Sequence, residues 1–217
     1  MYRVIFGVLF TLTVSGSAIG QAQYLVGGER AAGVVIGHLV APHTETFATP
    51  PVRVVLALNN VDVSLGYWQV EGDAGCHDTA ADCAPGVSHL VGLSGSVMLG
   101  RQSNESPVSV QILANGAMRT WGSDDGKPIF TAGLGTRMSS RLQDDDRAFL
   151  VPSFSIRMGV AETHFHELEG YVIGLGALAF GIIKGNNSLV LEGGYVFALG
   201  NTEERGITFK MGVLRRF

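Results

Sequence analysis

Long runs in which apolar residues alternate with small or polar ones constrain this chain more than any other feature. In residues 149–162, the even positions up to Val160 are apolar, whereas the odd positions include Ser153, Ser155 and Arg157. An alternation with a period of two is the signature of a β-strand that has one apolar face. The same pattern recurs in three further runs, at residues 108–121, 130–142 and 189–200.

The length of these runs favours strands that cross a membrane. Each run holds 12 to 14 residues, whereas strands of soluble proteins have about 5–6 and tilted membrane strands need about 9–11. Only 16% of the residues are charged, against about 25% in soluble domains. The second face of each run carries Gly, Ser, Ala and scattered charges, which suits the interior of a narrow barrel. We therefore expect a closed transmembrane β-barrel, with a soluble β-sandwich as the alternative.

A helical membrane span is not expected after the N-terminal segment. The most apolar later stretch, residues 171–183, has 13 residues and contains Gly174, Gly176 and Gly181. A helix needs about 20 apolar residues to cross a bilayer.

The N-terminal segment has the pattern of a secretory signal peptide. Arg3 precedes an apolar core at residues 4–14, and small residues follow before Gly20 and Ala22, the two candidate cleavage sites. The core is too short for a stable helical span. We expect a signal peptide at 1–22 and a single barrel domain at 23–217. The alternative interpretation is a buried N-terminal helix or a membrane anchor.

Ten segments alternate in this way, so we expect an all-β, closed, antiparallel, up-and-down barrel of ten strands. Short connections with turn chemistry, such as Asn59-Asn60, alternate with others of similar or greater length, such as 73–86. Short turns are typical of the periplasmic end of such barrels. Eight strands remain the alternative if residues 24–58 pack otherwise. The ten expected strands are residues 31–41, 52–58, 61–72, 87–101, 107–121, 129–142, 149–163, 170–184, 188–200 and 206–217.

The last segment carries a family resemblance. Ile207, Phe209, Met211 and Val213 alternate with small or polar residues, and the chain ends at Phe217. A terminal amphipathic strand that ends in an aromatic residue resembles the small bacterial outer-membrane β-barrel proteins. This resemblance implies a place in the cell outer membrane, contact with outer-membrane lipid and lipopolysaccharide, and recognition of Phe217 by the barrel-assembly machinery. One departure is Arg215, because a hydrophobic residue is usual two places before the end.

Nine charged residues are assigned to the inner faces of the expected strands. Isolated charges are costly in a low-dielectric interior, so we expect them to form ion pairs, with Glu192 and Lys210 as neighbours across the last two strands. A lumen filled by such pairs is the favoured interpretation, because open channels need about 16–18 strands. The alternative is a pore that conducts ions or solutes. The nine residues are Arg53, Asp62, Arg119, Arg137, Arg141, Arg157, Glu162, Glu192 and Lys210. Trp68 and Trp121 are assigned to the same inner faces.

The two cysteines are expected to form a disulfide. Cys76 and Cys83 lie in one connection, and exported chains meet an oxidising compartment. A metal site that uses these cysteines with nearby His and Asp is the alternative, although structural zinc usually takes cysteines two to four residues apart. His164 and His166 could also bind a metal or act as acid and base, but an isolated His-x-His is a weak motif.

No enzyme class is indicated. The connections are too short for the tall barrel of an omptin-like protease. A barrel-wall deacylase would need a His/Ser pair, yet Ser88 and His89 face opposite sides of one strand, and no Gly-x-Ser-x-Gly motif is present. A net charge of −4 without a run of Lys or Arg argues against nucleic acid. We expect a structural or surface-interaction barrel without catalysis or cofactor. The alternative is a narrow pore for small solutes, and a lipid-modifying or proteolytic enzyme is less favoured.

Overall fold

The computed structural model describes residues 30–40, 46–73, 85–120, 127–145, 147–162, 167–198 and 205–217. No helix in these ranges is long and apolar enough to cross a membrane. The strands are β1 (Arg30–Val40), β2 (Thr46–Leu58), β3 (Val61–Asp73), β4 (Pro85–Gly100), β5 (Ser109–Thr120), β6 (Ile129–Ser139), β7 (Gln143–Asp145), β8 (Ala148–Glu162), β9 (Leu168–Lys184), β10 (Asn187–Ala198) and β11 (Arg205–Arg216).

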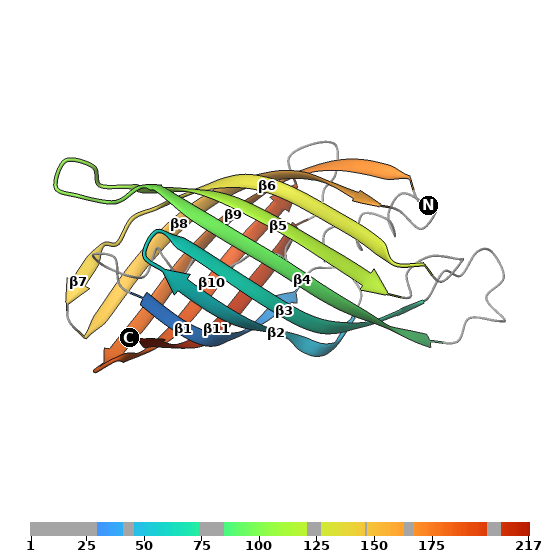
Figure 1. Cartoon of the computed structure of the whole chain (residues 1–217), viewed down its shortest axis with the longest axis horizontal. Helices are drawn as coiled ribbons and strands as arrows, with labels where there is room; N and C mark the ends of the chain where they lie inside the picture. The colour runs from blue at the N-terminus through green and yellow to red at the C-terminus, as the bar shows by residue number, and fades with distance from the viewer. Residues whose placement is uncertain are drawn as a thin grey trace.

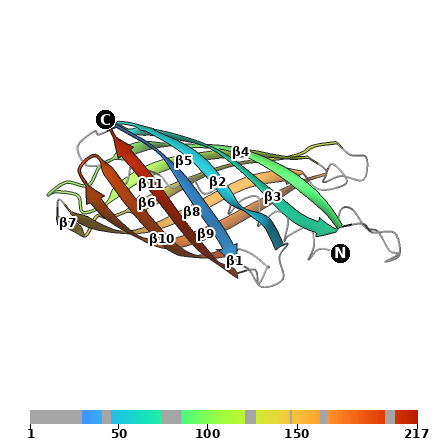
Figure 2. The same cartoon turned by 90° about the horizontal axis from the view of Figure 1, so that it is seen from below.

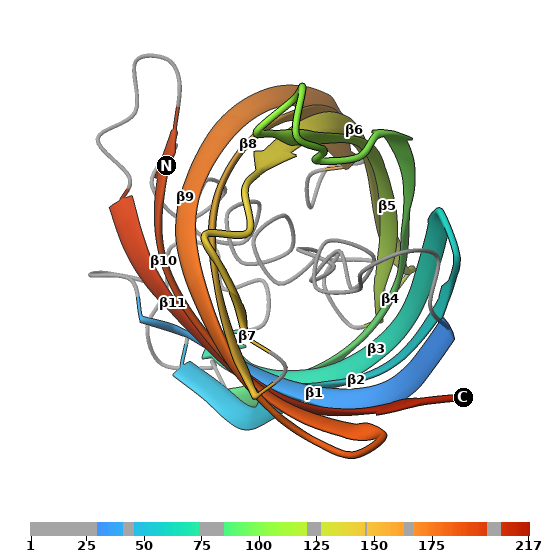
Figure 3. The same cartoon turned by 90° about the vertical axis from the view of Figure 1, so that its left-hand side faces the viewer.

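Ten long strands form a closed antiparallel barrel (Figures 1 and 3). Strands adjacent in sequence pair with each other, and the ring closes where β1 pairs with β11, with Val34 opposite Val213. The short strand β7 pairs only with the start of β8, while β6 pairs with the rest of β8. The ten-strand expectation is confirmed. The eight-strand alternative is wrong because β1 and β2 belong to the wall of the barrel.

Both ends of the described wall meet at one end of the barrel, which we call the terminal end. There the backbone N–H of Phe217 donates a hydrogen bond to the carbonyl of Arg30, at 3.1 Å. Figure 2 shows β1 and β11 running side by side to this end. Four connections lie at the same end, because each joins strands whose neighbouring ends are there: residues 59–60, 101–108, 140–147 and 185–186. Asn59 and Gly185 adopt positive φ angles of 55° and 60° in the two tightest turns.

Two details of the strands differ from the sequence expectation. β2 begins at Thr46 rather than residue 52, and its register with β3 is irregular on both sides of Thr49. The irregularity coincides with Pro50 and Pro51, which lack a backbone N–H to donate to a ladder. Residues 143–146 were expected to form a simple turn, but β7 folds back there onto the first residues of β8.

Apolar side chains face outward and polar side chains face inward in this barrel, which is the reverse of a soluble protein. On β8, the outward side chains of Phe154 and Met158 are 42% and 60% exposed. The inward Ser155 and Arg157 are only 2% and 3% exposed. The outward row of β11 is also apolar and exposed, from Ile207 to Val213. Large exposed apolar surfaces are rare on soluble proteins, and a closed barrel leaves no unpaired backbone edge in lipid. The barrel therefore spans a membrane, and the soluble sandwich is excluded.

We expect Phe154→Arg to lower the free energy of unfolding by about 2–4 kcal/mol, because it places a charge among the lipid chains. The matched control is the neighbouring inward residue, Ser155→Ala, which should cost far less. The measurement is urea unfolding of both variants in lipid vesicles. Equal losses for the two variants would contradict the facing of β8.

Candidate functional site

An apolar cluster, which we call the plug, lies on the inner face of the barrel near the terminal end. Its members come from six consecutive strands of the ring, from β8 through β11 to β1 and β2, and each is only 1–2% exposed. Ile183 packs against the cluster and is partly buried. The plug consists of Val35, Val55, Phe149, Val151, Ala179, Val190 and Leu214.

Phe149 is the largest side chain of the plug, and two neighbours hold its ring in place. The guanidinium carbon of Arg141 lies 4.9 Å from the ring centroid, in cation–π geometry. On β9, a Cβ at Gly181 would overlap the same ring. Only glycine at 181 leaves the space that the Phe149 ring occupies. The largest side chain of the plug is therefore packed tightly against the barrel wall.

Charged side chains from five strands occupy the middle of the lumen. We call Arg53, Arg137, Arg157, Glu192 and Lys210 the lumenal charge cluster. All five are buried, and the two most exposed, Arg53 and Lys210, are at 7% and 8%. Their charges act on one another: Arg157 interacts electrostatically with Arg137, Arg53 and Glu192, and Lys210 with the same three residues.

Glu192 and Lys210 form a buried ion pair. They occupy opposite positions in the β10–β11 ladder, and the Nζ of Lys210 donates a hydrogen bond to Oε1 of Glu192 at 2.7 Å. A one-residue shift of either strand would turn one partner toward lipid. The pair is thus a consequence of the register between the last two strands.

Arg157 is buried with part of its guanidinium unsatisfied. Its Nε and Nη2 atoms are shielded from solvent and have no hydrogen-bond partner. The charges that act on it include two other arginines and one carboxylate. A buried cation with unsatisfied N–H groups is costly, and among the described arginines Arg157 is the one with two such nitrogens.

Arg53 and Trp68 stack on the opposite wall of the lumen. The guanidinium carbon of Arg53 lies 5.7 Å from the Trp68 ring centroid, and the indole is fully buried. A Cβ at Gly66 or Gly92 would press against these two side chains, at 2.9 Å from Arg53 Cγ and from the indole respectively. The two glycines therefore make room for the indole inside the barrel.

Four other polar residues of the lumen form two local pairs. The hydroxyl of Ser96 donates a hydrogen bond to Oδ2 of Asp62 at 2.6 Å. Ser64 and Ser94 share a hydrogen bond of 2.8 Å. These contacts join β3 to β4 on the inner face.

Four of the nine expected lumen charges lie toward the ends of the barrel. Asp62 is buried beside the turn at 59–60. Arg119 is buried on the inner face of β5, and Arg141 lies against Phe149 beyond the end of β6. The assignment of Glu162 is wrong. Glu162 falls on the same outward row as Met158 and Val160, and its Oε2 accepts a hydrogen bond from the backbone N–H of Phe130 at 3.2 Å. The other eight charges are on the lumen side.

His89 is exposed on the outer wall and does not sit in a nucleophilic site. Its Nδ1 lies 2.8 Å from the hydroxyl of Tyr67 and 3.5 Å from Nε2 of Gln69, and its ring stacks on Tyr67 with centroids 6.1 Å apart. Ser96 faces the lumen, where it binds Asp62. The side chains that contact His89 are thus Tyr67 and Gln69, and the three residues form an aromatic and polar patch on the outer face of β3 and β4.

Several sequence predictions concern residues outside the described ranges. The signal peptide at 1–22, the disulfide between Cys76 and Cys83, the role of His164 and His166, and the position of Trp121 all belong to this group and stay predictions. Among the residues that are described, no group of three or more His, Cys, Asp or Glu side chains is placed to hold a metal ion.

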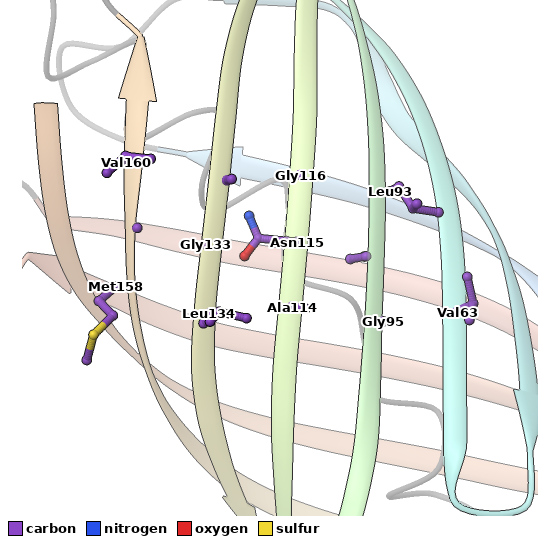
Figure 4. Close-up of a pocket in the computed structure, with 13 residues that line it drawn as sticks. Val63, Leu93, Gly95, Ala114, Asn115, Gly116, Gly133, Leu134, Met158 and Val160 are labelled. Atoms are coloured by element: carbon purple, nitrogen blue, oxygen red, sulfur yellow. The ribbon is translucent and has the colours of Figure 1, made fainter. Parts of the chain in front are cut away.

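A pocket of about 720 Å³ lies on the outer wall (Figure 4). Its walls include the exposed side chains of Leu93, Leu134 and Met158. Its floor is made by small residues such as Gly95 and Ala114. The pocket belongs to the same outward apolar surface as Phe154, so lipid chains of the bilayer reach it.

Comparison with known proteins identifies the fold. No family model matches the chain, and no curated protein matches it in sequence. Among solved structures, an outer membrane channel from Pseudomonas putida F1 is similar, with a TM-score of 0.52 at 10% identity over 92% of this chain and 99% of that one. This similarity shows that the chain has the fold of outer-membrane β-barrels.

Two further structures have similar coverage but lower TM-scores. The translocator domain of autotransporter NalP from Neisseria meningitidis has a TM-score of 0.49 at 11% identity, with 100% of both chains covered. The outer membrane protease OmpT from Escherichia coli has a TM-score of 0.42 at 10% identity, over 87% of this chain and 97% of that one.

Proposed function

We propose that this outer-membrane β-barrel is a closed, non-conducting scaffold that serves a structural or surface-interaction role. The observation that carries this proposal is the plug, whose buried apolar side chains pack on the inner face at the terminal end; we infer that they close the lumen there. An ion that crossed the plug would lose its hydration without gaining polar partners, which is costly. The connections at the opposite end would then be the part of the protein that meets other molecules.

The size of the barrel supports a closed lumen. Side chains just fill the interior of eight-stranded barrels, whereas aqueous channels have 16–18 strands. This barrel has ten long strands. Inward side chains such as those of Arg137 and Phe149 are almost completely shielded from solvent. We infer no catalytic role, because the contacts of His89 with Tyr67 and Gln69 lack a serine or aspartate.

A narrow pore for small solutes is the second candidate. It is favoured by one observation: the lumenal charge cluster holds four cations and one carboxylate, so the field in the lumen would draw anions. The similar structure from Pseudomonas putida F1 is described as a channel, but the likeness extends only to the fold.

Single-channel recording in planar bilayers tests the closed scaffold. We expect no conductance steps from the wild-type protein, because the plug blocks the lumen. The double variant Phe149→Ala/Leu214→Ala removes two large plug residues and should produce steps. The control is Phe154→Ala, which removes a Phe side chain from the outer face of β8 and should remain silent.

Regular conductance steps from the wild-type barrel would overturn the scaffold in favour of the narrow pore. In that case, the ratio of anion to cation permeability would show whether the excess of lumenal cations selects the solute.

A further inference from the structure

We propose that the lumen binds a small multivalent oxyanion, of the chemistry of phosphate or sulfate, between Arg157 on β8 and Arg53 on β2. This proposal goes beyond the scaffold role, because a closed barrel needs no ligand. It begins from the two guanidinium nitrogens of Arg157 that are buried without a partner. A native barrel does not normally leave a buried guanidinium in that condition.

The balance of charge distinguishes an anion from trapped water. In the middle of the lumen, the lumenal charge cluster holds four cations, namely Arg53, Arg137, Arg157 and Lys210, and one carboxylate, Glu192. The excess is three positive charges. Water molecules could satisfy the N–H groups of Arg157, but water cannot offset excess positive charge in a low-dielectric interior. A doubly charged anion would satisfy these N–H groups and offset most of the excess.

The positions of the arginines suit a ligand held at the centre. β2 and β8 are five strands apart in the ring of ten long strands, so they face each other across the lumen (Figure 3). Arg53 and Arg157 come from these opposite walls, and the charge of Arg53 acts on Arg157. Guanidinium groups present several N–H donors in a planar fork that matches the oxygens of phosphate. Two such forks that converge on one volume form an oxyanion site.

Two neutral hydroxyl groups that are available to donate hydrogen bonds lie on the same inner face. The hydroxyls of Ser155 and Thr208 are buried and have no hydrogen-bond partner. Ser155 precedes Arg157 by two residues on β8, and Thr208 precedes Lys210 by two residues on β11, so each hydroxyl shares the lumen side with a cation. These hydroxyls could donate to anion oxygens that the arginines do not reach.

The plug determines from which side the anion enters. An anion crossing from the terminal end would have to pass Phe149 and Leu214, which offer no polar group. Entry from the opposite end avoids this barrier. Lipid headgroups carry the same phosphate chemistry, but the paired wall of the barrel separates Arg157 from the bilayer. We therefore assign the site to a free oxyanion.

Fluorescence of Trp68 provides the binding experiment. Trp68 stacks on Arg53, and in a Trp121→Phe background it is the only remaining tryptophan of the two in the chain. The protein is refolded in a sugar-headed detergent that contains no phosphate, and inorganic phosphate is added at constant ionic strength set by chloride. We expect a saturable change in Trp68 emission and a phosphate-dependent rise in the urea midpoint of unfolding.

The variant Arg157→Gln should weaken phosphate binding at least tenfold. The matched control Arg215→Gln removes an exposed arginine outside the lumen and should bind phosphate as the wild type does. Without phosphate, Arg157→Gln should be at least as stable as the wild type, because it removes an uncompensated buried charge. A merely structural arginine would instead make the variant less stable in both buffers.

If Arg157→Gln does not fold, as judged by heat-modifiable gel mobility, Arg157→Lys replaces it. That variant keeps the charge and loses the planar fork, so phosphate binding should weaken while folding is retained. No phosphate effect on wild-type emission or stability overturns the proposal. An equal phosphate effect in the wild type and the tested Arg157 variant also overturns it. A response to short-chain phosphatidylglycerol but not to inorganic phosphate would assign the site to lipid and overturn the free-anion assignment.

Discussion

Deletion of residues 206–217 is expected to abolish the fold of the whole barrel rather than loosen one edge. β11 forms ladders on both sides, with ten register pairs to β1 and eleven to β10. Without it, β1 and β10 would each expose a row of unpaired N–H and C=O groups to hydrocarbon, and each such group costs several kcal/mol. No local rearrangement of a few residues could satisfy two edges of that length.

The measurement is heat-modifiable gel mobility of the protein refolded in detergent, together with its level in the outer membrane of cells. Removal of Phe217 alone is the matched control. Its side chain is 68% exposed, and its backbone N–H makes one bond, to Arg30, so refolding should be nearly unaffected. We propose that Phe217 acts as the assembly signal, so its loss should lower the membrane level in cells. A truncated 1–205 chain that stays folded would refute the role of β11 in closure.

The wall of the barrel could be predicted from the sequence because each part of the pattern is local. On β8, the alternation of Phe154 and Ile156 with Ser155 and Arg157 predicts which side chains face lipid. The prediction for Glu162 was wrong at the end of the same strand. An acidic residue was assigned inward from its charge, although it continues the even row, which can carry a polar residue once the strand leaves the lipid.

The plug and the unsatisfied arginine could not be predicted in the same way. Phe149 and Leu214 are far apart in sequence, and their presence in one cluster depends on the closure of the ring and on its diameter. The pairing of Glu192 with Lys210 was predictable because a hairpin brings neighbouring strands together. The surroundings of Arg157 depend on β2, which lies across the lumen, and no pattern within β8 contains that information.

Glu192→Met is expected to lower the free energy of unfolding by about 3–5 kcal/mol, the usual cost when one partner of a buried ion pair is removed. Two effects contribute to this loss of stability. The ammonium of Lys210 would lose its hydrogen bond at 2.7 Å. Glu192 is also the carboxylate that acts on Arg157. Urea unfolding in vesicles, in phosphate-free buffer, measures the loss.

The reverse variant, Lys210→Met, should cost clearly less, and this asymmetry identifies the source of the effect. The lumenal charge cluster carries a net charge of +3; loss of Glu192 raises it to +4, whereas loss of Lys210 lowers it to +2. The double variant Glu192→Met/Lys210→Met keeps +3 and fills similar volume with apolar atoms, so its stability should lie near that of the wild type. Equal losses in the two single variants would mean that only the pair itself matters. A double variant as unstable as Glu192→Met would mean that packing around the pair, and not charge, sets the cost.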